Sequence, residues 1–297
     1  MSGVRQPAVA GRFYEGTRET LARSLRECFL HPPGPGSLPE ADPEGPGLID
    51  AVVSPHAGHM FSGPAAAHGF AALAADGVPD IAIILGPSHY AAERSAAVSG
   101  ADAWLTPLGQ VPVDAELCRE LVAASPLLEA DDHAHRLEHS LEVQVPFLQF
   151  IYPDRVPPLC PICLRSHPMS NVDQVVEDAR DLGRTIAQAV GSRRAVVVAS
   201  TDFSHQIPDD VARRQDRLAL DAILAQDPER LLRTVYENEI SMCGPVPVAA
   251  ALSFCLARGP HEAKLLTYYT SGDIIGDRRA VVGYASLVIK RTGGDAP

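Results

Sequence analysis

The sequence predicts an α/β fold, a single domain with a mostly parallel or mixed central β-sheet flanked by helices. Apolar runs of strand length recur along the chain, at residues 48–54, 81–86, 156–164, 195–201, 263–270 and 280–289. Segments with helical apolar spacing lie between them, at residues 63–75, 114–124, 172–190, 211–225 and 245–257. Strands that alternate with helices indicate βαβ units and a sheet buried on both faces.

Composition and length fit this class. The chain has 297 residues, of which 46% are hydrophobic and 21% charged, enough apolar material for a sizeable core. A chain of this length forms one large domain or two modest ones. Neither an internal repeat nor a second composition is visible, so we expect one domain over residues 1–297.

The N-terminal elements have clear boundary signals. Residues 17–30 carry apolar side chains at helical spacing (Leu21, Leu25 and Phe29), and Thr17 is a plausible N-cap. The segment 31–47 contains six prolines and four glycines, which can neither continue a helix nor pair in a central strand. It is predicted to be a loop.

Charge and cysteine usage exclude several classes of function. The net charge is -12 and no Lys/Arg stripe could follow a phosphate backbone, so nucleic acid is not an expected partner. No apolar segment approaches the roughly 20 residues that span a bilayer, and the N-terminus lacks the pattern of a secretory signal. Six scattered cysteines do not resemble a disulfide scaffold, which indicates reduced thiols and a cytoplasmic location.

Histidines follow three of the predicted strands. His56 follows the run 48–54, His89 follows the run 81–86, and Asp202 and His205 follow the run 195–201. If the first two strands are parallel neighbours about 4.8 Å apart, His56 and His89 emerge at the same carboxyl edge, where open α/β folds bind ligands. A single histidine in this position is usually an ordinary loop residue. For three histidines at equivalent strand ends, a ligand site and ordinary loop residues are about equally good interpretations.

Cys243 and Gly244 precede a helix that begins with proline, in the segment SMCGPVPVAAALSFC. A thiol there faces the positive end of the helix dipole, which favours the thiolate that binds metals or acts as a nucleophile. On spacing alone, a small buried capping residue is the favoured interpretation.

The motifs PHAG (55–58), GPSH (86–89), EHSLE (138–142), STDFSH (200–205) and CGPVPV (243–248), in this order, resemble the MEMO family. This is the family of the AmmeMemoRadiSam system protein B. The similarity runs from VAGRFYEG near the N-terminus to GYASLVI near the C-terminus, and therefore covers nearly the whole chain.

The resemblance implies a fold similar to the LigB-type class III extradiol dioxygenases, which hold non-haem iron with two histidines and a carboxylate. It implies one metal ion bound by His56, His89 and Cys243, with His205 in a place similar to the dioxygenase base and Asp202 beside it. A thiolate in place of the carboxylate shifts the metal preference toward copper or zinc and puts ring cleavage in doubt. Fe(II) or Cu is favoured, and Zn is possible.

Other motifs compete with this interpretation. HRLEH (135–139) fits the pattern of inverted zinc peptidases, but no third ligand can be placed, and we expect Glu138→Gln to leave bound metal unaltered. CPIC (160–163) lies inside a strand pattern and is interpreted as core. His59 is a candidate pocket residue. Glu138 and His139 lie at a predicted loop-to-helix junction, which could place either of them beside the metal, in contact with its ligands, and His139 is included as a candidate pocket residue.

Two functions remain from the sequence. The first is a metal-dependent oxidoreductase of unknown substrate, in which His205 moves a proton. The alternative is a non-catalytic binding or scaffold protein that engages a small molecule or a peptide, or radical SAM and AMMECR1-like proteins. Fold alone does not decide between them.

Overall fold

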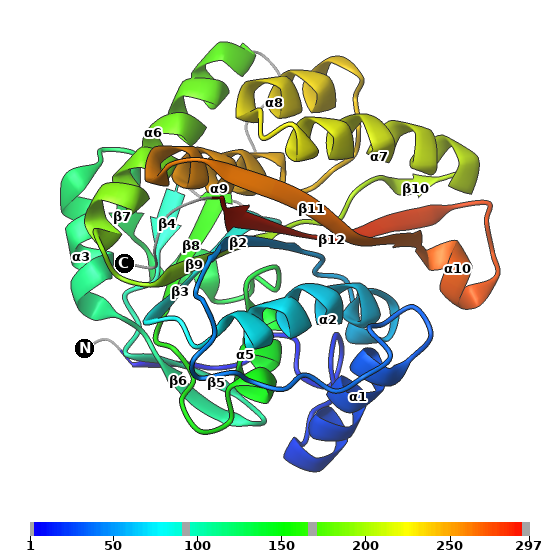
Figure 1. The fold of residues 1–297 in the computed structure, drawn as a ribbon, viewed down its shortest axis with the longest axis horizontal. Coiled ribbons are helices and arrows are strands. Elements are labelled where there is room, and N and C mark those ends of the chain that lie inside the picture. Colours follow the sequence, from blue (N-terminus) through cyan, green and yellow to red (C-terminus); the bar gives the residue numbers. More distant parts are fainter. Residues whose placement is uncertain (1–2, 91–95, 166–170, 293–297) are drawn as a thin grey trace.

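The computed structural model describes residues 3–90, 96–165 and 171–292. Its main feature is a nine-stranded sheet with the order β10-β12-β2-β9-β3-β8-β4-β7, to which β11 adds by pairing with β12 (Figure 1). The strands of this sheet are β2 (Ile49–Ser54), β3 (Ile81–Ser88), β4 (Ala96–Val98), β7 (Leu128–Ala130), β8 (Leu159–Arg165), β9 (Ala195–Ser200), β10 (His205–Ile207), β11 (His261–Thr270) and β12 (Val281–Arg291). A smaller three-stranded sheet consists of β1 (Val4–Arg5), β5 (Ala103–Thr106) and β6 (Gly109–Pro112).

The sheet is mixed, which confirms the predicted fold class. Strands β2, β9, β3 and β8 are parallel and form its centre, whereas β12 is antiparallel to β2 and β4 is antiparallel to β8. Every residue of β2 and β9 is buried, as expected for strands covered on both faces.

Helices cover both faces of the sheet (Figure 1). On one face α2 packs against β2 and β12 and is itself covered by α1 and α5; on the other, α9 packs against β2, β3 and β9, with α6 and α8 outside it. The helices are α1 (Arg18–Leu30), α2 (His59–Asp76), α3 (Ala115–Ala124), α4 (Asp132–His135), α5 (Val145–Ile151), α6 (Val172–Val190), α7 (Asp209–Leu224), α8 (Pro228–Glu237), α9 (Pro245–Arg258) and α10 (Ser271–Ile275), with a 3₁₀ turn η1 (Glu142–Gln144). Among the helices of the described ranges, none is both apolar and long enough to cross a membrane.

The longer predicted elements are confirmed. Each of the six strand-length runs contains a strand of the sheet, and each predicted helix is present. The side chain of Thr17 caps α1 by accepting a hydrogen bond from the backbone N–H of Thr20, and residues 31–47 contain neither helix nor strand. A single domain over the whole chain stays a prediction.

One topological expectation is wrong. Strands β2 and β3 are not neighbours, because β9 lies between them and pairs with both. Hydrophobic patterning identifies a strand but does not determine its place in the sheet. The connection from β2 through α2 to β3 passes over one strand position, which β9 occupies. The carboxyl ends of β2, β9 and β3 nevertheless lie side by side at one edge, so the segment that begins at Thr201 leaves the sheet between His56 and His89.

Candidate metal centre

His56 lies at the carboxyl edge of the sheet, two residues beyond β2, and only 2% of its surface is exposed. Its backbone N–H donates to Oδ1 of Asp202 at 2.8 Å, and its ring Nδ1 lies 2.8 Å from Oγ of Ser200. The Ser200 hydroxyl donates its only hydrogen to the carbonyl of Ser140, so it accepts from His56 Nδ1–H. The neutral ring therefore carries its free lone pair on Nε2, the atom that can bind a metal.

His89 directly follows β3 and is oriented by Glu138. Its Nδ1 lies 2.9 Å from Oε1 of Glu138, and its backbone N–H donates to Oε2 of the same carboxylate at 2.6 Å. Burial would raise the pKa of Glu138, but the side-chain and backbone hydrogen bonds from His89 and one from the Ser140 backbone lower it to about 2. Because an ionised carboxylate only accepts hydrogen bonds, Nδ1 of His89 is the donor and Nε2 is left free.

His139 completes a cluster of three imidazoles. Candidate ligand atoms of His56, His89 and His139 all lie within 4.8 Å of one another, close enough for one metal ion to reach all three. The ring of His139 lies 4.4 Å from that of His89 and 5.6 Å from that of His56, centre to centre. Phe13 also packs against His139, with the ring centres 4.6 Å apart.

Cys243 approaches the cluster from the loop before α9. Its Sγ lies 3.1 Å from Nε2 of His56 and accepts a hydrogen bond from the backbone N–H of Asp202 at 3.1 Å. The neighbouring Gly244 makes this approach possible, because a Cβ at that position would lie only 2.4 Å from the carbonyl oxygen of Ser200. The CG pair thus places a sulfur beside the imidazole that follows β2.

Burial dominates the electrostatics of these groups in the protein without metal. It lowers the pKa of His56 and lowers the pKa of His139 to about 4, so both rings are neutral at pH 7 and able to bind a metal. Burial also raises the pKa of the Cys243 thiol, and the nearby Asp202 raises it further. The thiolate expected from the helix dipole is therefore not favoured in the protein alone, and a metal would have to displace the proton.

Asp202 and His205 lie in the segment that leaves β9. Asp202 is buried and accepts from the backbone of His56, and its pKa is raised by burial, which the charge of His205 partly opposes. His205 is partly exposed, with its Nδ1 2.8 Å from the carbonyl oxygen of Ser241. A carbonyl only accepts, so the carbonyl of Ser241 fixes the tautomer of His205 and leaves its Nε2 free.

His59 lies apart from the three clustered imidazoles. Its Nε2 lies 3.0 Å from the carbonyl oxygen of Val143, and its ring packs against those of Phe147 and Tyr14. Burial lowers its pKa to about 4. His59 borders a separate cavity of about 460 Å³ between residues 11–15, α1 and the start of α2. It therefore contributes to packing in the structure.

The competing motifs adopt other structures. Helix α4 ends at His135, whose Nε2 lies 3.0 Å from the carbonyl oxygen of Ala97 and whose ring packs on Trp104, so HRLEH does not form the helical turn of a zinc peptidase. The cysteines of CPIC are buried in the central strand β8, as expected of core residues.

Sequence reasoning missed the residues that orient the ligands. Ser200 and Gln144 lie beneath His56, where Gln144 donates to Oγ of Ser200 and to the carbonyl of Pro55. Arg5, near the N-terminus, donates to the carbonyl oxygens of His135 and Glu138. Their only sequence signal is the presence of polar residues in apolar surroundings, which does not identify their partners.

The contact between Glu138 and His89 changes the expectation for Glu138→Gln. We now expect this variant to weaken metal binding by about 10- to 100-fold, because an amide is a weaker acceptor for His89 Nδ1–H and its NH₂ group can turn toward the ring. Titration of purified protein with metal in competition with a chelator measures the effect. Glu116→Gln, at an exposed position on α3, is the matched control and should be unchanged. Equal metal affinities of the Glu138→Gln variant and the wild type would show that the hydrogen bond between Glu138 and His89 does not contribute to metal binding.

The fold and the site together define a class: an α/β protein with histidine and cysteine side chains gathered at the carboxyl edge of a mixed sheet. The family model described as "Memo-like protein" matches residues 5–288. The chain belongs to this family.

Curated relatives agree with the family model over their full length. A MEMO1 family protein of Methanopyrus kandleri, MK0963, is 42% identical over 97% of this chain and 99% of its own. One of Methanothermobacter thermautotrophicus, MTH_45, is 41% identical over 96% of this chain and 99% of its own. Among solved structures, uncharacterized protein JW3007 of Escherichia coli K12 shares the fold, with a TM-score of 0.53 and 14% identity over 81% of this chain and 99% of that one.

Proposed function

We propose that the chain binds one metal ion through His56, His89 and Cys243, with His139 as a further neighbour, and uses it in an oxidoreductase reaction. The observation that carries this proposal is the way in which the two imidazole rings are held: in each ring one nitrogen is already hydrogen-bonded to the protein, and the other nitrogen is left to bind a metal. His56 and His89 each use Nδ1 as a donor to a fixed oxygen, on Ser200 and Glu138, which leaves Nε2 as the ligand atom. Metal-binding histidines are commonly held in this way.

The donor set guides the choice of metal. Imidazole suits iron, copper and zinc, whereas a thiolate favours Cu(I) and zinc over hard cations. The resemblance to iron dioxygenases supports Fe(II), so Fe(II) or Cu is proposed ahead of Zn. When bound, a redox-active metal would supply electron transfer and Lewis-acid activation at an open coordination position.

The chain itself would supply proton transfer. In the neutral ring of His205, the hydrogen on Nδ1 is held by the carbonyl of Ser241, and Nε2 can accept a proton from a substrate. His205 is partly exposed, while His56 and Asp202 are buried. We propose that His205 transfers protons and is not a metal ligand.

His205→Ala is expected to retain metal but to lower any metal-dependent activity by about 10²- to 10⁴-fold. His205→Asn separates the two roles of the ring, because its amide can still donate to Ser241 but has no titratable nitrogen. Elemental analysis and oxygen consumption of the metal-loaded protein would be measured for both variants, with the exposed His31→Ala as control. Loss of metal from folded His205→Ala protein would make His205 a ligand and remove the proposed role.

The state of the cysteines supports a cytoplasmic location, which we also propose. All six cysteines of the sequence lie in the described ranges and are free. Reduced thiols are typical of the cytosol, where disulfides rarely persist.

A further inference from the structure

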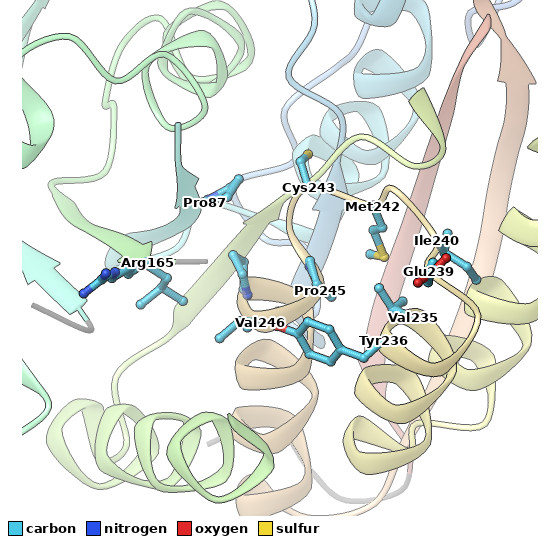
Figure 2. A pocket seen from close by; sticks show the side chains of 12 residues that line it. Pro87, Arg165, Val235, Tyr236, Glu239, Ile240, Met242, Cys243, Pro245 and Val246 are labelled. Carbon is cyan, nitrogen blue, oxygen red and sulfur yellow. The ribbon is translucent and has the colours of Figure 1, made fainter. Parts of the chain in front are cut away.

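A pocket of about 250 Å³ adjoins the candidate metal centre on the side of the sheet covered by α8 and α9 (Figure 2). Figure 2 shows Pro87 and Cys243 at one end of this pocket and Tyr236 at the other. Cys243 is the residue that the pocket shares with the candidate metal centre, and Pro87 lies two residues before His89. A molecule in this pocket would therefore lie next to two of the proposed ligand segments.

The walls of the pocket are mostly apolar. Ile240, Met242, Pro245 and Val246 contribute, and Ile240, Met242 and Val246 are almost fully buried in the protein. The two charged side chains, Arg165 and Glu239, lie on opposite flanks in Figure 2 and have opposite signs. An ionised ligand would lose its hydration on entering the pocket, and the pocket has no net charge of the opposite sign to compensate. The pocket therefore favours a neutral group.

The volume sets the size of the ligand. A dry apolar cavity of about 150 Å³ holds a benzene molecule, so a pocket of about 250 Å³ accommodates one substituted ring and not a fused system with large substituents. A thioether such as that of Met242 contacts aromatic rings favourably, and proline faces pack flat against them. A single neutral ring fits both the size and the walls.

The loop between α8 and α9 connects this pocket to the proposed chemistry. Ile240 and Met242 line the pocket, whereas Ser241 between them holds His205. Cys243 both lines the pocket and contacts His56. This loop follows the end of α8 at Glu237 and contains Glu239, whose φ of 51° is in the left-handed region. A ligand that packs on Ile240 and Met242 thus touches the same short segment that positions Ser241 and Cys243.

We propose that this pocket holds the neutral, ring-sized part of the substrate of the metal centre, and that its occupancy is sensed by Cys243. The assignment to that substrate rests on the proposed function; the existence of the binding pocket does not. The probe is p-cresol, with 4-methylbenzoate as a charged molecule of similar shape. We expect p-cresol to bind and 4-methylbenzoate to bind at least tenfold more weakly.

Methyl NMR of protein labelled at methionine with ¹³C locates the probe without any substitution. The Met242 methyl signal, assigned with Met242→Leu, should shift on addition of p-cresol, whereas that of Met60, which is 73% exposed and lines the separate cavity beside His59 instead of this pocket, should not. Val246→Trp fills the pocket and should abolish the binding with metal content unchanged. Leu256→Trp, at an exposed position on the same helix, is the matched control.

The outcomes separate the two proposals. An unmoved Met242 signal at saturating p-cresol, or unchanged p-cresol affinity in Val246→Trp protein, would overturn the pocket. Binding of p-cresol by protein that cannot be loaded with metal would support the pocket and overturn its assignment to a metal-centre substrate. In Co(II)-loaded wild type, p-cresol should change the thiolate-to-cobalt absorption; an unchanged spectrum at saturation would overturn the link to Cys243.

Discussion

His56→Ala is expected to weaken metal binding by more than about 100-fold, which is the upper end of the effect seen when a residue that only orients a metal ligand is replaced. In the proposed site His56 contributes a ligand atom directly, and its ring is buried and fixed by Ser200, so alanine removes a donor that is already oriented for binding. Competition against chelators of graded affinity measures the change, with metal per chain from elemental analysis.

His133→Ala is the matched control, because His133 is exposed on the short helix α4 and should not affect metal content. Cys243→Ser tests the sulfur independently and should reduce the affinity for soft metals more than for hard ones. If His56→Ala protein kept the stoichiometry and affinity of the wild type, the metal would have to bind elsewhere in the chain.

Arg5→Met is expected to lower the free energy of unfolding by about 3–5 kcal/mol. Arg5 forms a buried ion pair with Glu142, with Nη1 and Oε2 2.5 Å apart, and its guanidinium also donates to the carbonyls of His135 and Glu138. The same Glu142 carboxylate accepts hydrogen bonds from the backbone of Ala8 and Val9 and from the Tyr14 hydroxyl. Removing the cation leaves a buried carboxylate without its charge partner, a costly arrangement.

Urea unfolding of the metal-free protein measures this loss, with Arg12→Met at an exposed position near the same terminus as control. The double variant Arg5→Met with Glu142→Gln should be less destabilised than the sum of the two single variants, since the two side chains interact directly. A cost below about 1 kcal/mol, the range of exposed pairs, would show that the pair is not buried in solution.

The fold was predictable where the chain carries long, uniform patterns. Strands β2, β3 and β9 read as apolar runs because both of their faces are covered, and α6 has a strong apolar stripe along its length. Short elements such as β4 and β10 have three residues each, too few to show a period. Strand order was missed because it depends on how crossovers pack, which no local pattern encodes.

The site was predictable in its residue types more than in its contacts. The exits of β2, β9 and β3 indicated His56, Asp202 and His89 as candidates, whereas Cys243 was assigned only through the family resemblance, because its spacing alone favoured a capping role. The structure places Asp202 and Cys243 in contact with His56, and His89 at the same edge of the sheet. The partner of His89 could not be inferred, because Glu138 is 49 residues away in the sequence and reaches it from a loop between short helices. The position of His139 beside His56 and His89 depends on the same loop, which Arg5 holds from the opposite side.

The proposal that His56, His89 and Cys243 bind one metal ion is tested most directly by X-ray absorption spectroscopy at the metal edge. The protein would be purified anaerobically without chelators, and the metal found by elemental analysis would define the edge. We predict one metal per chain, with a single sulfur scatterer that disappears in Cys243→Ser and imidazole scattering that weakens in His89→Ala. A metal-free wild type that cannot be loaded with Fe(II), Cu or Zn, or a spectrum that neither substitution changes, would contradict the proposal.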